Sequence, residues 1–545
     1  MPPHGLKTRR RGVLPLLAVL LVTPLLAGCM GMGSLGEDHG GDHGQTTGTP
    51  SLSPLDRSVA GLPPSAPTTQ VNLTGGAVFN LTAGLVAHSP TGGQPIRMFA
   101  YNGQIPGPTL RAPQGATVDV LFRNDLPVET TVHWHGLRLE AGSDGVPHVS
   151  QPPVPPGGTF RYRLSFPDEG VFWYHPHVRE DLQQELGLQG AILVDGPRDA
   201  AEAWPREEVV LLDDLLLDDT GDVAPFSSES ANRVLMGRYG NEFLANGRSD
   251  LQLTAAPGER VRLHLIDSTN ARPFRLAVAA AASVQLVGLD GGYLGQPVPF
   301  EPLTLSPGER ATLDIVMPAE GSVQILHAPP AESRELMRIA IDPLLPKQAP
   351  AEAPQGPHNR ARAEMAPALA RADDPVDLTW DLDVQIAGAT TSNPHAGHGG
   401  GASQPTEEGS AEPIEWETGD MEETNAGSTP ETVTWVIRDA ESGRENEDLN
   451  YSFQQGSFVK IRIRNLETSA HPMQHPIHLH GQRFIVNSID GVENPIPAWK
   501  DVVLVPAGSE AVITVEMSNP GTWVFHCHIN EHLEADMEGR FTVAA

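Results

Sequence analysis

The sequence predicts an all-β protein built from three similar Greek-key β-sandwich domains. Its 545 residues allow about three domains of ordinary size. The 55 glycines and 51 prolines favour many short strands joined by turns over long helices. A turn followed by an alternating strand recurs along the chain, twice in each expected domain. These turns begin at or near Pro113, Pro156, Pro257, Pro307, Gln455 and Pro506.

The repeated hairpins place the domains at residues 68–197, 198–345 and 376–545. The third domain is expected to carry an acidic, histidine-containing insertion at about residues 388–430. Between the second and third domains, residues 346–375 are rich in Ala and Pro, and we predict that they form a linker.

Residues 1–28 have the pattern of an export signal. A basic start is followed by an apolar run from Val13 to Leu26, which is too short for an ordinary membrane-spanning helix. The sequence Leu26-Ala27-Gly28-Cys29 resembles a bacterial lipobox, so we expect a lipid anchor on Cys29. A signal that is cleaved next to an incidental cysteine is the alternative. The protein is therefore expected in the periplasm or at the cell surface.

The export route stays open between the general secretory and twin-arginine pathways, because Arg10-Arg11 also suits a twin-arginine signal. Residues 29–67 are rich in Gly, Ser, Thr and Pro and are predicted to be a flexible tether. The formal charge of −32 becomes −36 once the four basic residues of the signal are removed. Such a negative chain is a poor partner for nucleic acid.

The most informative stretch is His526-Cys527-His528-Ile529-Asn530-Glu531-His532, followed by Met537. Cys527 is the only cysteine beyond residue 29, so it has no partner for a disulfide within the folded domains. In an extended segment successive side chains point to opposite faces, so Cys527 can face one metal while His526 and His528 face a second. Cys527, His532 and a weak axial Met537 are three of the four ligands of a blue-copper centre. A buried free cysteine beside unrelated histidines is the alternative.

Three further histidine groups precede this stretch. They are His133-Trp134-His135-Gly136, His175-Pro176-His177 and His475-Pro476-Ile477-His478-Leu479-His480. Together the four groups resemble, in order, the copper motifs of the multicopper oxidases, and the resemblance extends over about residues 70–545. It implies domains of the cupredoxin type and four copper ions in each chain: one type 1, one type 2 and a type 3 pair.

The resemblance also implies a role for each ligand. His475, Cys527 and His532 would hold the type 1 copper, with Met537 axial, and His133 and His478 would hold the type 2 copper. The type 3 pair would be held by His135, His175, His177, His480, His526 and His528. The second domain has Arg272-Pro273-Phe274-Arg275 and only His327 at the matching places, so we predict that it has no copper ligands.

Two carboxylate positions that members of this family use near the cluster are occupied here by Leu533 and Asn530. Asp144 matches the family's acid near the type 2 copper and is our candidate for proton supply, although an Asp-Gly turn would also explain it. Glu531 is the weaker candidate.

The resemblance implies a laccase-like oxidase, a copper-dependent enzyme that would couple four one-electron oxidations of phenolic or amino-aromatic donors to the reduction of dioxygen to water. A metallo-oxidase of Cu(I), Fe(II) or Mn(II) is the alternative, because Thr406–Glu423 holds eight acids and follows two histidines, His395 and His398. A non-catalytic copper-binding scaffold is a third possibility, since fold alone does not decide function. The expected partners are an electron donor and dioxygen, and we expect a monomer.

Overall fold

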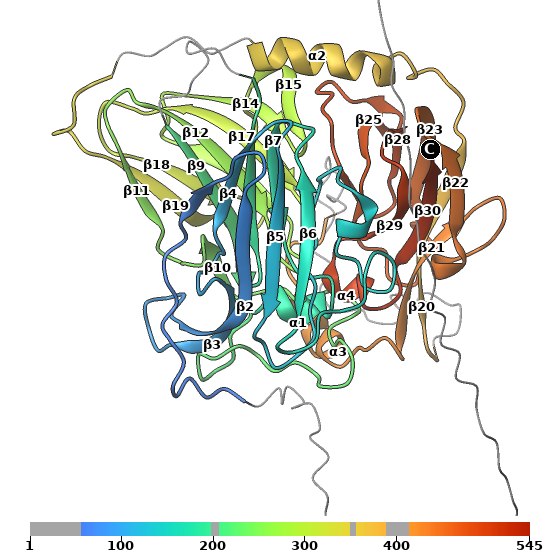
Figure 1. The fold of residues 1–545 in the computed structure, drawn as a ribbon, viewed down its shortest axis with the longest axis horizontal. Coiled ribbons are helices and arrows are strands. Elements are labelled where there is room, and N and C mark those ends of the chain that lie inside the picture. Colours follow the sequence, from blue (N-terminus) through green and yellow to red (C-terminus); the bar gives the residue numbers. More distant parts are fainter. Residues whose placement is uncertain (1–55, 198–205, 349–355, 389–413) are drawn as a thin grey trace, which may run out of the picture. The chain divides into compact units, whose positions relative to one another are not determined.

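The computed structural model describes residues 56–197, 206–348, 356–388 and 414–545, which form three β-sandwiches (Figure 1). This confirms the predicted fold class. The export signal, Cys29 and residues 389–413 of the insertion lie outside the described residues. Among the helices in the described ranges, none is both long and apolar enough to cross a membrane.

The first sandwich packs two four-stranded sheets, in the orders β1-β4-β8-β7 and β3-β2-β5-β6. Alternate side chains of β5 point into its core: Val118, Val120 and Phe122 are buried, while Leu121 and Arg123 point outward and are exposed. The strands are β1 (Gln70–Asn72), β2 (Val78–His88), β3 (Ile96–Tyr101), β4 (Thr109–Pro113), β5 (Thr117–Asn124), β6 (Thr159–Ser165), β7 (Gly170–Tyr174) and β8 (Gly190–Asp195).

The second sandwich has a six-stranded sheet, β10-β9-β12-β17-β14-β15, against a five-stranded one, β11-β19-β18-β13-β16. Its strands are β9 (Glu207–Leu215), β10 (Glu242–Ala245), β11 (Gln252–Ala255), β12 (Arg260–Asp267), β13 (Phe274–Ala279), β14 (Ser283–Leu289), β15 (Gly292–Pro299), β16 (Leu303–Leu305), β17 (Arg310–Val316), β18 (Ser322–His327) and β19 (Arg334–Ile341).

The third sandwich repeats this topology, with sheets β21-β20-β23-β28-β25-β26 and β22-β30-β29-β24-β27. The repeat seen in the sequence therefore corresponds to repeated strand order. The strands are β20 (Leu378–Ile386), β21 (Val433–Asp439), β22 (Asn450–Gln454), β23 (Ser457–Asn465), β24 (His475–Leu479), β25 (Arg483–Ile489), β26 (Val492–Glu493), β27 (Val502–Val505), β28 (Glu510–Met517), β29 (Gly521–Cys527) and β30 (Glu538–Ala544).

Helices are few in the described part of the chain. Three are short: α1 (Glu180–Gln183), α3 (Glu422–Ala426) and α4 (Asn530–Leu533). The fourth, α2 (Gly356–Leu369), lies in the segment that we predicted to be a linker. It crosses from β15 to β25 (Figure 1), and its Ala361, Met365 and Ala368 pack with Tyr293, Ile485 and Trp499. Composition alone did not reveal this helix, because the side chains that bury its apolar face belong to the second and third domains.

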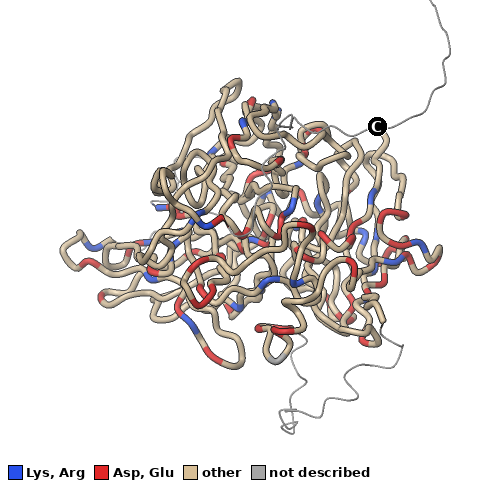
Figure 2. The backbone as a smooth tube through the Cα atoms, turned by 90° about the horizontal axis from the view of Figure 1, so that it is seen from below, with Lys and Arg blue, Asp and Glu red and all other residues tan. Residues whose placement is uncertain are grey.

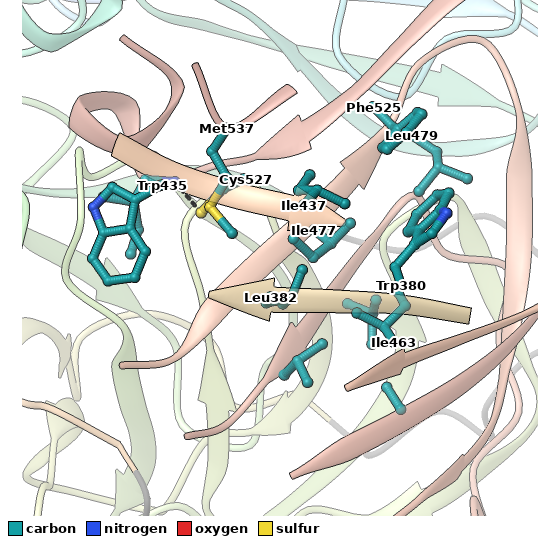
Figure 3. Close-up of a cluster of buried hydrophobic side chains, with 14 of the residues drawn as sticks. Trp380, Leu382, Trp435, Ile437, Ile463, Ile477, Leu479, Phe525, Cys527 and Met537 are labelled. Atoms are coloured by element: carbon teal, nitrogen blue, oxygen red, sulfur yellow. Dashed lines mark hydrogen bonds between the residues drawn. The ribbon is translucent and has the colours of Figure 1, made fainter. Parts of the chain in front are cut away.

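The core of the third domain surrounds the residues that the sequence singled out. Figure 3 shows Cys527 and Met537 side by side in a cluster with Trp435, Ile437 and Ile477. Charged positions, by contrast, are spread along the backbone (Figure 2). The predicted ligands at this site thus lie among buried apolar side chains.

Candidate metal centres

The first candidate centre lies where β24, β29 and α4 meet. The Cys527 Sγ atom is 3.6 Å from Nδ1 of His475 and 3.6 Å from Nδ1 of His532, and the two Nδ1 atoms are 3.3 Å apart. Cys527 ends β29, and the turn of α4 brings His532 back toward it. All three side chains and Met537 are fully buried. The backbone of Met537 accepts a hydrogen bond of 3.1 Å from Cys527 N, which holds the methionine at the same site.

This donor set fits a type 1 copper. Burial raises the pKa of the Cys527 thiol, so a cation is needed to hold the thiolate there. Burial likewise lowers the pKa of His475 to about 3, which leaves it neutral and able to coordinate. Two imidazoles, one thiolate and a nearby thioether are the ligand types that copper selects in such sites.

The other eight histidines come from two equivalent places in the first and third domains. His133 and His175 form a β-bridge, with hydrogen bonds of 2.8 and 3.2 Å between their backbones, and His478 pairs with His526 in the same antiparallel manner. The register makes Pro176 the counterpart of Cys527. Because alternate residues of a strand share a face, each His-x-His pair directs two imidazoles to one side.

The two sets of histidines stack on each other across the domain boundary. The ring centroids of His133 and His480 are 4.0 Å apart, and those of His135 and His478 are 3.8 Å apart. Three groups result, each with its ligand atoms within 4.8 Å: His133, His135 and His478; His135, His175 and His528; His177, His480 and His526.

These groups fit a trinuclear copper cluster. The Nε2 atoms of His133, His175, His177 and His478 are buried and have no hydrogen-bond partner within the described ranges. Burial, followed by the neighbouring imidazoles, lowers the pKa of His135, His175 and His478 far below the ordinary value, so these rings are neutral. Neutral, unpartnered imidazole nitrogens that converge from several strands are what copper requires. The division of these histidines into type 2 and type 3 ligands stays a prediction from the resemblance.

Two aspartates orient these imidazoles by the same pattern. His133 Nδ1 donates to the backbone oxygen of Asp144 at 2.8 Å, and His478 Nδ1 donates to that of Asp501 at 2.8 Å. Each carboxylate then reaches the other domain: Asp144 Oδ2 is 2.9 Å from His480 Nδ1, and Asp501 Oδ1 is 2.9 Å from His135 Nε2. Such contacts fix the ring tautomer and orientation of metal ligands. Sequence reasoning proposed Asp144 and missed Asp501.

The second predicted acid, Glu531, is directed elsewhere. Its Oε1 atom accepts a hydrogen bond of 3.0 Å from Asn270 of the second domain, and burial, followed by the charge of Asp181, raises its pKa to about 8. A glutamate that does lie beside the cluster is Glu180, with Oε1 3.1 Å from His177 Nδ1 and Oε2 3.6 Å from His175 Nδ1. Its position three residues after His177, in the first turn of α1, was the available signal.

The second domain supplies no member of any candidate metal group in the described residues. Leu276 pairs with His327 as Ile477 pairs with Cys527, so His327 stands at the position of the copper thiolate. The counterpart of His475 is Phe274. This pocket is filled by aromatic rings: the centroids of Phe274 and Phe243 lie 5.3 and 5.7 Å from that of His327.

Two profiles described as "Multicopper oxidase" match the chain, at residues 83–199 and 417–545. Multicopper oxidase MmcO of Mycobacterium tuberculosis is 29% identical over 478 residues, which cover 82% of this chain and 84% of that protein. Laccase-1 of Cryptococcus neoformans is 26% identical, over 90% of this chain and 83% of the relative.

Among solved structures, a multi-copper oxidase from Pseudomonas thermotolerans superposes with a TM-score of 0.65 at 26% identity, covering 87% of this chain and all of that one. The four histidine motifs lie within the two matched ranges, and the structure brings these motifs together into groups that fit copper. The chain therefore belongs to the multicopper oxidases, copper-dependent enzymes that reduce dioxygen.

Proposed function

We propose that the protein is a laccase-like oxidase, which takes single electrons from phenolic or amino-aromatic donors and uses four of them to reduce dioxygen to water. The coppers supply the redox chemistry when they are bound. The chain itself contributes the short covalent connection between sites: Cys527 belongs to the first centre, and its neighbours His526 and His528 belong to two groups of the cluster.

The observation that carries the proposal is the cover over the type 1 site. His475 and His532 are fully buried, so a donor cannot touch their rings. The indole of Trp435 stacks on His532 with centroids 4.1 Å apart and meets His475 edge-on at 4.7 Å. Its Nε1 atom donates to Val234 of the second domain at 2.8 Å, which holds the ring in place. Electrons from a donor must cross this layer of side chains. Such a site suits donors that are oxidised without binding to the metal.

Residues 414–430 complete the cover. Asn425 accepts a hydrogen bond from Met236 N at 2.9 Å and donates to the Gly237 oxygen at 2.8 Å, while Ser428 accepts from Leu235 N at 2.9 Å. The described part of the insertion is thus tied to the second domain rather than free. A donor that approaches the type 1 site meets this surface.

The same segment favours a second candidate, a metallo-oxidase. Glu415, Glu417 and Glu423 are exposed on it, and carboxylates attract cations over roughly a Debye length of about 10 Å. Part of this charge is neutralised, because Arg272 lies 3.2 Å from Glu417 and Arg233 lies 2.5 Å from Glu422.

Oxygen uptake under steady-state turnover tests the proposal. We expect kcat/KM to be higher for a small phenol than for Cu(I), Fe(II) or Mn(II). Glu415→Gln with Glu423→Gln should leave phenol turnover unchanged, as should the control pair Glu320→Gln with Glu332→Gln on the second domain. A preference for one of the cations, reduced by the first pair and not by the control, would establish the metallo-oxidase instead.

A further inference from the structure

Arg310 is a buried residue of the second domain that reaches the ligands of the cluster. It begins β17 and is 1% exposed. Its Nη1 and Nη2 atoms lie 2.5 and 2.7 Å from Oδ1 and Oδ2 of Asp501, a paired contact with both carboxylate oxygens. Its Nε atom donates to the backbone oxygen of Val171 and its Nη1 atom also donates to that of Gly308, each at 3.0 Å. One guanidinium thus connects all three domains.

Asp501 transmits this contact to the cluster. Its Oδ1 atom, which Arg310 holds, is also 2.9 Å from Nε2 of His135, and its backbone oxygen accepts from His478. Arginine suits this role because its planar fork matches a carboxylate and sets the plane as well as the place of the group. A fixed carboxylate plane in turn fixes the rotation of the His135 ring.

The backbone around the pair is built for close approach. A Cβ atom on Gly136 would lie 2.7 Å from Asp501 Oδ2 and 2.8 Å from Arg310 Nη2. A Cβ atom on Gly308 would lie 2.9 Å from Cδ2 of His528 and 3.0 Å from Cε1 of His135. The second domain therefore touches one three-histidine group directly, in addition to the contact through Asp501.

The two equivalent aspartates differ in their counter-charge. Asp501 has Arg310, whereas the Oδ1 atom of Asp144 is buried without a hydrogen-bond partner among the described residues. A second set of ion pairs joins the same two segments: Lys500 Nζ is 2.9 Å from Asp290 Oδ2 and 2.9 Å from Glu309 Oε1. Two adjacent residues of the third domain, Lys500 and Asp501, thus each meet an opposite charge from the second.

We propose that Arg310 is a positioning residue of the dioxygen-reducing centre, and that the second domain acts on the cluster through the Arg310–Asp501–His135 contact. The domain then does more than separate the other two. This inference does not depend on which donor the enzyme oxidises.

The test replaces Arg310 in the full-length, copper-loaded enzyme and follows copper as well as activity. Arg310→Met removes the fork and keeps most of the apolar volume. The matched control is Arg262→Met, because Arg262 is an equally buried arginine of the same domain. Its Nε and Nη2 atoms bind Asp314 at 2.9 and 3.2 Å, and its Nη1 atom donates to the Tyr293 hydroxyl at 2.8 Å, so these contacts stay within the second domain. Each variant removes the arginine from one buried carboxylate, that of Asp501 or that of Asp314.

We expect Arg310→Met to weaken retention of cluster copper against a chelator by about 10–100-fold and to change the electron paramagnetic resonance signal of the type 2 copper. Type 1 absorption should stay normal, and Arg262→Met should keep the cluster intact. Arg310→Lys, which restores the charge but not the fork, should recover part of the loss. Combining Arg310→Met with Asp501→Asn should cost no more than Asp501→Asn alone, since the arginine acts through the aspartate.

The proposal is overturned if Arg310→Met and Arg262→Met change copper retention and the resonance signal equally. It is also overturned if neither variant changes them. If Arg310→Met does not fold, Arg310→Lys is compared with Arg262→Lys by the same two measurements. An unaltered signal in Arg310→Lys together with unaltered copper retention then counts against a positioning role.

Discussion

Gly308→Ala offers a sharp steric test of the contact between the second domain and the cluster. Gly308 follows Pro307 in the turn before β17 and has a φ of +86°. Gly157 follows Pro156 in the corresponding turn of the first domain, with a φ of +73° and no heavy atom within 4 Å of an added Cβ. In both turns an alanine in this left-handed conformation costs about 1–2 kcal/mol. The pair therefore shares its backbone penalty and differs in what the methyl group meets.

At Gly308 the methyl group meets two ligands. Its carbon would be 2.9 Å from His528 Cδ2 and 3.0 Å from His135 Cε1, so the rings or the turn must retreat by about 0.5 Å to reach an ordinary carbon contact of about 3.5 Å. Metal–ligand distances tolerate only about 0.2 Å. We expect copper affinity of the cluster to fall by about 10–100-fold, the range seen when groups that orient ligands are lost.

The assay is copper retention per chain against a chelator, with thermal midpoints measured alongside. Gly308→Ala should lose more stability than Gly157→Ala, because only its methyl group overlaps buried rings. Both variants should keep the type 1 absorption, and only Gly308→Ala should release cluster copper. Equal retention in the two variants would show that residues 307–309 relax without moving His135 or His528, and the steric reasoning would fail.

Three further predictions concern other parts of the molecule. Cys527→Ser should abolish the intense blue absorption and the oxidase activity without unfolding the third domain, because the thiolate is both the source of the colour and the connection to the cluster; a variant that stays blue would refute the ligand assignment. Asp144→Asn should remain blue and accept electrons normally but be reoxidised by dioxygen at least about tenfold more slowly, within the range typical of acid–base groups, and stopped-flow reoxidation at the wild-type rate would exclude Asp144 as the proton source. Burial, followed by the charges of Arg272 and Arg334, lowers the pKa of His327 from 6.5 to about 3. Below about pH 6.5 the unfolded chain therefore binds a proton at this histidine that the folded chain does not bind. Between pH 7.5 and pH 5 the free energy of unfolding of the wild type should fall by about 2 kcal/mol for this reason, and that of His327→Leu should not. Equal pH dependence of the two thermal midpoints would contradict this.

The sequence by itself determined the ligand motifs. Cys527, its flanking histidines and His532 lie within seven residues, and strand alternation divides their side chains between two faces whatever the rest of the fold does. The repeated turn-and-strand pattern likewise determined the three sandwiches, because a period of two and a Pro-Gly turn are local properties. The absence of ligands at Phe274 was equally visible, since it follows from residue type at a repeated position.

Only the tertiary structure decided what surrounds the ligands. Asp501 lies 366 residues from His135 and 191 from Arg310, and no local pattern marks the aspartate as the counterpart of Asp144. Glu180 and Glu531 both stand near a ligand histidine in sequence, yet the turn of α1 brings Glu180 against His177, while α4 directs Glu531 to Asn270. The helix α2 was not predicted either, because its apolar face packs on residues distant in the sequence. Ligand motifs depend on backbone geometry within a few residues, whereas the groups that orient ligands depend on how three separately folded sandwiches pack.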